Sequence, residues 1–367
     1  MRCRLLKRRL KLATPLMTAQ GPISERVVWV IALDDGAGRI GLGEAAPLAG
    51  FGSETPEQCR DVFNTVLKAL TGEFIIDWLD RGRPDAPLGP LEKMLGGAPC
   101  ARSAIEGALL DLAAQKNERS LATYLTGDSS ETILPLSVPV NALLGGSLTE
   151  VTAGAAELIK SGFTSYKLKV GGPTTSIAAD VERVFAVRDI IGAQAKLRVD
   201  ANCAWTLDQA MEFAVEVADA NLEFCEQPLA AADLEGMSTL RRRTGLKIAV
   251  DEAVRTAADI GRVAAAQAAD IVVLKPMFLG GWRPTKQAAE LATSCGLSVV
   301  ITSALEGSIG RAHSTHMAAA IGLNERAQGL GTGSFIIDDL TASPLMVIQG
   351  LIPIPQSPGL GIGALRG

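Results

Sequence analysis

Short apolar runs alternate with helical stretches from about residue 134 onward, and this alternation constrains the fold more than any other feature of the chain. The runs, in chain order, are LSVPVNAL, SYKLKV, KLRVDAN, NLEFCEQP, KIAVDEA, DIVVLKP, LSVVITSALE and the weaker AQGLGTG. Apolar strands separated by helices are typical of a parallel sheet that helices cover. Eight such units predict a closed (β/α)₈-type barrel.

Acidic residues close three consecutive strands of this predicted barrel. Asp200, Glu226 and Asp251 each end an apolar run, one strand-plus-helix unit apart. They therefore share one level at the carboxyl ends of the strands, where active sites of such barrels lie. Any one of them alone would be a solvated strand-end residue, but three carboxylates this close repel one another unless a cation lies between them. All-oxygen ligation suits Mg²⁺, with Mn²⁺ as a possible substitute, so we predict a metal site here.

Lysines flank the acids on both sides. Lys167 and Lys169 alternate with Leu168 and so share one face of the second strand, while Lys275 closes the sixth strand across the barrel. A neighbouring cation lowers the pKa of a lysine, and a lysine that is neutral near pH 7 can act as a general base. We predict that Lys169 takes a proton from the carbon beside a substrate carboxylate and that Lys167 supplies the electrostatic push. A metal that binds this carboxylate stabilises the enediolate that forms.

Other polar residues near the predicted mouth are weaker candidates. Glu306 ends the seventh strand and could hydrogen-bond a lysine or orient the substrate. Gly280 and Gly281 follow the sixth strand and could form an anion site at a helix start, although a plain turn explains them equally well. His313 and His316 lie three apart on the next helix, and without an acidic cluster nearby they favour a packing or surface role over metal ligation.

The first 130 residues have a different pattern. The basic opening segment MRCRLLKRRLKLATPL lacks the continuous apolar core of a signal peptide, so we predict a first strand, with a transit peptide as the alternative. Residues 26–33 and 39–46 flank turn residues and predict a hairpin, and residues 57–70 and 101–124 have helical spacing. We expect an α+β capping domain over 1–130, the barrel over 131–340, and a tail, about 341–367, that completes the first domain.

Composition and charge limit the partners. Hydrophobic residues make up 47% and charged residues 20%, which indicates a globular chain with a large core. The net charge of −5 argues against a nucleic-acid partner, and no run approaches the roughly 18 apolar residues of a membrane span. The six cysteines form no CxxC pair, which favours free thiols in a cytoplasmic protein. We expect a small-molecule carboxylate as substrate, and nothing in the sequence indicates an oligomeric state.

Together these residues resemble a known family, the muconate-lactonizing subgroup of the enolase superfamily. The motifs that carry the likeness are Ser165-x-Lys167-x-Lys169, Asp200-Ala-Asn202, Glu226-Gln-Pro228, Asp251-Glu252 and Lys275-Pro276. Each motif alone is weak, but the set is specific and covers nearly the whole chain. The resemblance implies a modified TIM barrel whose capping-domain loops, here around residues 18–21 and 50–53, close over the substrate. It also implies that Lys275 holds an anionic intermediate by its charge.

Within the subgroup, GLGEAAPLAGFGSET (41–55) and TSALEGSIG (302–310) most resemble the o-succinylbenzoate synthase family. That resemblance implies the dehydration of 2-succinyl-6-hydroxy-2,4-cyclohexadiene-1-carboxylate in menaquinone or phylloquinone synthesis. It places Ser303 near the succinyl end, with Glu306, Asn202 and Gly280 as further candidates for substrate contact.

Other members of the superfamily fit the sequence to different degrees. No histidine closes a late strand, as the mandelate-racemase subgroup would require, and GLGTG stands where dipeptide epimerases usually carry Asp-x-Asp. N-succinylamino acid racemases and cycloisomerases share the same lysines and acids and stay open, since fold and catalytic set do not fix the substrate. A non-catalytic ligand-binding barrel is the remaining alternative, which the complete set of charges disfavours.

Overall fold

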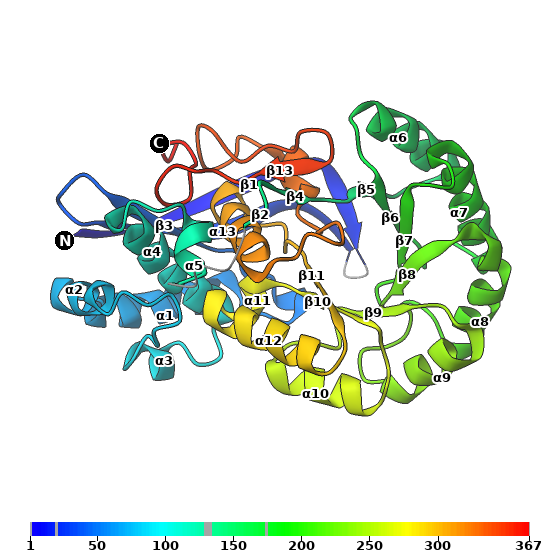
Figure 1. Cartoon of the computed structure of the whole chain (residues 1–367), viewed down its shortest axis with the longest axis horizontal. Coiled ribbons are helices and arrows are strands. Elements are labelled where there is room, and N and C mark those ends of the chain that lie inside the picture. The colour runs from blue at the N-terminus through cyan, green and yellow to red at the C-terminus, as the bar shows by residue number, and fades with distance from the viewer. Residues whose placement is uncertain (1, 19–20, 128–133, 173–174, 367) are drawn as a thin grey trace.

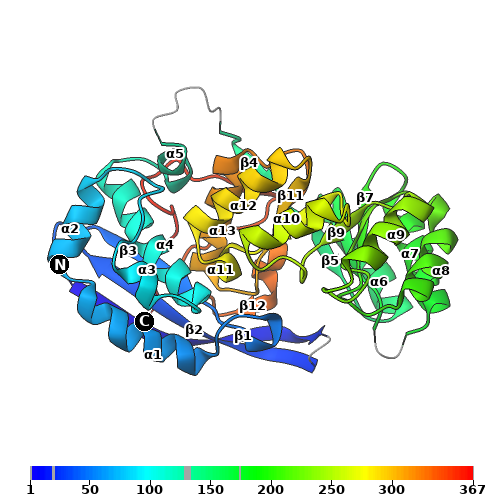
Figure 2. The same cartoon turned by 90° about the horizontal axis from the view of Figure 1, so that it is seen from below.

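The computed structural model describes residues 2–18, 21–127, 134–172 and 175–366. It has an N-terminal α+β part and a ring of parallel strands with helices around its outside (Figure 1). Figure 2 shows the N-terminal sheet and helices at one end of the molecule and strands β5–β9 with their helices at the other. The predicted architecture of a capping domain and a (β/α)₈-type barrel is confirmed.

The N-terminal part is built on an antiparallel sheet in the order β12-β1-β2-β3. Its strands are β1 (Arg2–Thr18), β2 (Gly21–Asp34), β3 (Ile40–Ala45) and β12 (Ile336–Ile337). The basic opening segment therefore forms a strand, as predicted, and the turn at residues 34–36 joins β2 to β3 in the expected hairpin. Apolar side chains of β2 alternate between the faces of the sheet and become fully buried toward its end, which fixes the register against β1.

Helix α4 (Pro99–Lys116) lies between this sheet and the barrel. It packs on β3 and on barrel helices, and because it is covered on most sides its buried residues run around the helix and include the charged Arg102, Glu106 and Asp111. The close approach requires glycine in β3, since a Cβ at Gly43 would collide with the carbonyl oxygen of Ala104. The remaining helices of this part are α1 (Pro56–Ala69), α2 (Gly72–Asp80), α3 (Leu91–Met94) and α5 (Leu121–Leu125).

The prediction of one helical stretch over residues 101–124 is wrong. Helix α4 ends at Lys116, and Glu118 adopts a left-handed conformation with φ of 53°. Helix α5 then starts afresh after Ser120, whose side chain accepts a hydrogen bond from the backbone N–H of Thr123. The positive φ breaks the helix, and this N-cap starts a new one, because a serine hydroxyl replaces a missing backbone partner there.

Seven parallel strands form the ring in the order β11-β10-β9-β8-β7-β6-β5. They are β5 (Ala142–Leu144), β6 (Ser165–Lys169), β7 (Lys196–Asp200), β8 (Leu222–Glu226), β9 (Ile248–Val250), β10 (Ile271–Leu274) and β11 (Ser298–Ile301). The helices that follow them are α6 (Leu148–Lys160), α7 (Ile177–Ile191), α8 (Leu207–Glu216), α9 (Leu234–Thr244), α10 (Ala257–Ala265), α11 (Pro276–Leu279), α12 (Trp282–Ser294) and α13 (Ser308–Ile321).

The eighth strand is reduced to two single-residue bridges that close the ring. Gln328 pairs in parallel with Val140 beside the first strand, and Gly329 pairs with Thr302 beyond the end of β11. The backbone N–H of Gly329 donates to the carbonyl of Ile301 at 2.8 Å. The weak AQGLGTG run therefore occupies the eighth position, but its glycines supply few side chains to hold a longer strand.

The tail contacts both parts of the molecule. Strand β13 (Leu351–Pro353) pairs with β4 (Ser137–Pro139) just before the first barrel strand, and the N–H of Leu121 in α5 donates to the carbonyl of Gly359 at 2.8 Å. These contacts agree with a tail that returns to the first domain, and the boundaries near residues 130 and 340 stay predictions. Among the described residues, no helix is long and apolar enough to cross a membrane.

Candidate active site

One pocket at the carboxyl ends of the barrel strands gathers the charged residues that the sequence singled out. Six of them form what we call the charged wall: Lys167, Lys169, Asp200, Glu226, Asp251 and Lys275. They come from strands β6 to β10, where parallel register pairs Lys169 with Asp200 and Asp200 with Glu226. Register alone thus sets these side chains next to one another, because adjacent strands are about 4.8 Å apart.

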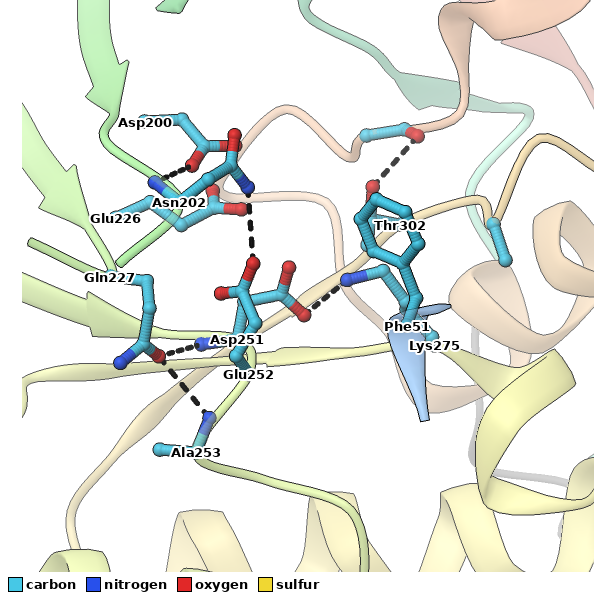
Figure 3. A network of polar contacts seen from close by, with 12 residues as sticks. Phe51, Asp200, Asn202, Glu226, Gln227, Asp251, Glu252, Ala253, Lys275 and Thr302 are labelled. Carbon is cyan, nitrogen blue, oxygen red and sulfur yellow. Dashed lines mark hydrogen bonds and ion pairs between the residues drawn. The ribbon is translucent and has the colours of Figure 1, made fainter. Parts of the chain in front are cut away.

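The lysines and carboxylates of the charged wall are paired with each other. Lys167 Nζ lies 2.8 Å from Asp200 and 2.9 Å from Glu226, and Lys169 Nζ lies 2.7 Å from Asp200. Lys275 makes an ion pair with Asp251, at the end of the neighbouring strand (Figure 3). Of the three lysine side chains, that of Lys169 is the most exposed, at 30% against 12% for Lys167 and 17% for Lys275. It is therefore the lysine that a ligand in the pocket reaches most easily.

Burial and crowding disturb the acids of this wall. Burial raises the pKa of Glu226 to about 7, the neighbouring carboxylate of Asp200 adds to the shift, and Lys167 opposes it. Burial also works to raise the pKa of Asp200, but Lys167 and Lys169 outweigh it and hold that pKa below its usual range. The acids thus depend on nearby positive charge to stay ionised.

The charge of Lys167 is firmly held in this arrangement. Burial works to lower its pKa, but the carboxylates of Asp200 and Glu226 outweigh the burial and raise it. Burial is likewise overcome at Lys275, where Asp251 and Glu252 raise the pKa. The charged form of both lysines is therefore favoured in this arrangement, which suits electrostatic support of an anion.

The donor set suits a divalent cation. In the described part of the chain no three His, Cys, Asp or Glu side chains converge closely enough to hold a metal, since lysine ammonium groups lie against the carboxylates of Asp200, Glu226 and Asp251. The carboxylates nevertheless sit at the ends of the neighbouring strands β7, β8 and β9 and line one pocket. Three buried acids that repel one another and offer only oxygen ligands fit Mg²⁺.

Asn202, Glu252 and Gln227 form a hydrogen-bonded surround of the charged wall (Figure 3). The Asn202 side chain accepts from Lys169 Nζ at 2.6 Å and donates to Glu252 at 3.1 Å. Gln227 is fully buried, and its side-chain oxygen accepts the backbone N–H groups of Asp251 at 3.0 Å and Ala253 at 3.2 Å. Asn202 therefore lies against the predicted base, and Gln227 fixes the backbone that carries Asp251.

The rest of the pocket carries no charge. We call this the neutral wall: Leu48, Phe51, Asn141, Leu143, Phe278, Thr302, Ser303, Ala304, Leu305, Gly329, Gly331 and Thr332. The hydroxyls of Ser303 and Thr332 are hydrogen-bonded to each other at 2.8 Å. Asn141 is 5% exposed, and its buried side-chain oxygen has no hydrogen-bond partner among the described residues.

Two of the weaker candidates lie outside the pocket lining. The carbonyl of Gly280 accepts a hydrogen bond from Arg102 of α4, so this turn contacts the N-terminal part rather than the mouth. Glu306 is fully buried, and its carboxylate accepts the backbone N–H of Ala304 and faces the hydroxyl of Ser314. Glu306 thus shapes the loop after β11 from below, while Ser303 and Asn202 do line the pocket.

The two histidines have packing roles, as expected. His313 Nε2 is 2.8 Å from the carbonyl of Leu42 in β3, and His316 Nδ1 accepts the backbone N–H of Ala122 at 3.1 Å. The other His316 nitrogen lies 3.0 Å from the carbonyl of Leu360 in the tail. Both rings therefore join α13 of the barrel to the N-terminal part and the tail.

The structure describes one of the two predicted capping-domain loops fully and the other only in part. Phe51 and Leu48, from the segment around residues 50–53, line the pocket. In the other loop, residues 19–20 lie outside the described residues. Among the pocket residues that the sequence did not single out, Asn141 directly precedes β5, Thr332 lies in a short 3₁₀ helix (Gly331–Phe335), and neither carries a charge. Because these two residues are uncharged, only the pattern of the strands around them could have indicated them in the sequence.

Comparison with known proteins places this fold and site in one class. Residues 150–365 match the family model described as "Enolase C-terminal domain-like". Over 358 residues the chain is 30% identical to L-Ala-D/L-Glu epimerase of Bacillus subtilis, covering 96% of this chain and 93% of the epimerase. It is 40% identical over 218 residues to o-succinylbenzoate synthase of Thermobifida fusca, covering 59% of this chain and 67% of that protein.

A solved structure agrees over the whole length. The dipeptide epimerase of Enterococcus faecalis V583, complexed with Mg and the dipeptide L-Leu-L-Tyr, superposes with a TM-score of 0.87 and 26% identity, covering 99% of both chains. This chain is an enzyme of the enolase superfamily. Within it the chain belongs to the muconate-lactonizing subgroup, whose members among its relatives include muconate cycloisomerases, epimerases and o-succinylbenzoate synthases.

Proposed function

We propose that this enzyme is an o-succinylbenzoate synthase, which removes water from 2-succinyl-6-hydroxy-2,4-cyclohexadiene-1-carboxylate with the help of Mg²⁺. The observation that carries the proposal is the position of Lys169 and Lys275, which lie on opposite sides of three clustered acids. Identity to the Thermobifida fusca synthase is higher, though over a shorter stretch, than identity to the epimerase or to the cycloisomerase of Acinetobacter lwoffii.

The carboxylates of Asp200, Glu226 and Asp251 would hold the metal. When bound, Mg²⁺ supplies positive charge next to the substrate carboxylate, where negative charge develops as the α-proton leaves. Asp200 holds Lys169 in an ion pair, and Lys169 would leave this pair if Asp200 served as a metal ligand. Lys167 and Lys275 keep their positive charges on either side of the anion.

Lys169 would carry out both proton transfers. Its neutral amine takes the α-proton, and the electron pair of the broken C–H bond passes into an enediolate on the substrate carboxylate. The enediolate then collapses to form the new ring double bond, the neighbouring C–O bond breaks, and the leaving hydroxide takes the proton back from Lys169 as water. Proton and hydroxyl leave from the same face, because one residue serves both steps.

The neutral wall supports a substrate whose remote end carries no ammonium group. Among the described residues, the acids that line the pocket are the three of the charged wall, so no further carboxylate is there to pair with an ammonium group. The hydroxyls of Ser303 and Thr332 offer hydrogen bonds instead. This arrangement disfavours the free amino end of a dipeptide, while the two hydroxyls can hydrogen-bond the oxygens of a succinyl chain.

N-succinylamino acid racemase is the second candidate. Lys169 and Lys275 approach from opposite sides of the pocket. Racemization requires this arrangement, because a proton leaves one face of the α-carbon and another returns to the opposite face. In support, a chain with 25% identity and a TM-score of 0.87 is an N-succinyl Arg/Lys racemase from Bacillus cereus. The carbon skeleton would pass through the same enediolate in both reactions.

Variants of Lys275 separate the two candidates. The wild type and Lys275→Arg should be assayed with the cyclohexadiene substrate and, in D₂O, with N-succinylamino acids. Arginine keeps the positive charge but cannot give up its proton, so a synthase should keep measurable dehydration. In a racemase the variant should exchange the α-proton of one enantiomer without inverting it. A wild type that dehydrates no cyclohexadiene substrate but inverts N-succinylamino acids would overturn the synthase proposal.

A further inference from the structure

Arg26 of β2 is a buried cation that binds only backbone carbonyls. Its residue is 3% exposed, and its guanidinium reaches two chain segments that are more than 250 residues apart in sequence. The acceptors are the carbonyls of Ala46 at 2.7 Å, Pro47 at 3.0 Å, Ala304 at 3.2 Å and Leu305 at 3.4 Å.

These two segments form opposite parts of the neutral wall. Ala46 and Pro47 lead directly into Leu48, which the N-terminal part contributes to the pocket, and Ala304 and Leu305 are themselves pocket residues of the barrel. Leu305 has a φ of 59°, a left-handed conformation that a leucine adopts only when its surroundings enforce it. The guanidinium lies behind this strained backbone and ties it to the other side of the pocket.

Buried acids reinforce the same join. Glu44, on the strand next to Arg26, accepts the backbone N–H groups of Gly307 at 2.6 Å and Gly310 at 2.8 Å, at the start of α13. Glu306 accepts the N–H of Ala304, and both carboxylates act electrostatically on Arg26. The loop from Ala304 to Gly310 is therefore held to the N-terminal sheet by Arg26 on its carbonyls and by Glu44 on its amides, while Glu306 bonds within the loop.

We propose that Arg26 is a positioning residue that sets the spacing between the two sides of the neutral wall, and with it how tightly the substrate is held. The proposal rests on this pocket being the substrate site of the proposed function. Only a planar guanidinium with five donors can reach four carbonyls on two segments at once, whereas a lysine ammonium has three donors on one atom. Arg26 touches no pocket atom of the charged wall, so its effect should fall on binding rather than on proton transfer.

Arg188 of α7 provides a matched control. It is 8% exposed and also donates only to backbone carbonyls, those of Gly192, Ala195, Ala220 and Asn221, at 2.8 to 3.1 Å. All of these acceptors lie within the barrel, and none lines the pocket. Arg188→Lys therefore removes the same kind of contact without touching the neutral wall.

The test compares Arg26→Lys, Arg26→Met and Arg188→Lys in the full chain, by steady-state kinetics with Mg²⁺ and by amide hydrogen exchange. We expect Arg26→Lys to raise KM about tenfold with kcat within about threefold, the signature of lost binding common to substrate and transition state. Exchange should accelerate at residues 46–48 and 304–307 together. Arg26→Met should show both effects more strongly, and Arg188→Lys should leave KM unchanged.

Three outcomes would overturn the proposal. They are an unchanged KM in Arg26→Lys, an equal rise of KM in Arg188→Lys, and faster exchange in only one of the two segments. If Arg26→Met fails to fold, Arg26→Lys alone decides. If the wild type turns over neither the cyclohexadiene substrate nor N-succinylamino acids, the proposed function fails, and coupled exchange of the two segments still decides whether Arg26 joins them.

Discussion

The two walls of the pocket differ in how they are built. The charged wall comes from consecutive strands β6 to β10, and its side chains meet because parallel register places their strand ends at one level. The neutral wall is assembled from the first strand, the end of β11, the reduced eighth strand and a segment of the N-terminal part. The charged wall follows from the repeated strand-plus-helix unit, and the neutral wall follows from contacts between segments that are distant in the sequence.

This difference separates chemistry from substrate choice. In the proposed mechanism the charged wall holds the groups that move a proton and balance charge. The neutral wall would meet the part of the substrate that differs between a cyclohexadiene, an N-succinylamino acid and a dipeptide. Damage to the first wall should therefore abolish turnover, and damage to the second should change binding.

Removal of the divalent metal should have the largest effect. We expect excess chelator to abolish turnover and Mg²⁺ to restore it, with Mn²⁺ as a partial substitute, because Asp200, Glu226 and Asp251 repel one another without it. Glu226→Gln, which removes one of three negative charges, should raise the Mg²⁺ concentration needed for half-maximal activity. Full activity in excess chelator would show that the charged wall works without a metal.

Substitution of the base should come next. Lys169→Ala should lower kcat by about 10²–10⁴-fold or more, because one residue serves two proton transfers. Lys160→Ala is the control, since its side chain is 70% exposed on α6 and far from the pocket. Circular dichroism should show that both variants fold. Near-normal turnover of Lys169→Ala would show that Lys169 is not the base and would make Lys275 the next candidate.

Acid should weaken the contacts of α13 with the N-terminal part and the tail. Burial lowers the pKa of both His313 and His316 to about 4, below the ordinary 6.5, so the fold favours their neutral forms. The stability that this preference contributes is complete above pH 6.5 and is lost as the pH falls toward 4. The loss is on the order of 3 kcal/mol for each ring.

Denaturant unfolding measured from pH 7 to pH 4 checks this. They are the only two histidines in the chain, so no other imidazole contributes. His316→Gln should unfold at lower denaturant at pH 7 but lose less stability on acidification than the wild type. An equal loss in both proteins would show that carboxylates alone cause the acid sensitivity.

A single hydroxyl of the neutral wall should have the smallest effect. Ser303→Ala removes the partner of Thr332 and one donor to the substrate, so we expect KM to rise by up to about tenfold with little change in kcat. Ser294→Ala, at the exposed end of α12, is the matched control. A large fall in kcat for Ser303→Ala would mean that the neutral wall also takes part in the chemistry.

The sequence predicted the barrel and its charged residues well because both are periodic. Strand-end charges recur once per strand-plus-helix unit, so Lys169, Asp200 and Glu226 could be aligned without knowing any distant contact. The same reasoning failed where local pattern and tertiary contact disagree. Residues 101–124 look like one helix, but Glu118 breaks it, and Gly280 looks like a mouth residue but faces Arg102.

The sequence by itself determined the barrel, the three acids, the three lysines and the packing role of the histidines, because those features depend on spacing along one chain. Only the tertiary structure decided which uncharged residues face the acids. Asn141, Thr332 and Leu48 lie on three segments that come together through ring closure and through the docking of the N-terminal part. A neutral side chain has no long-range field and no fixed spacing, so its place in the pocket follows from packing alone.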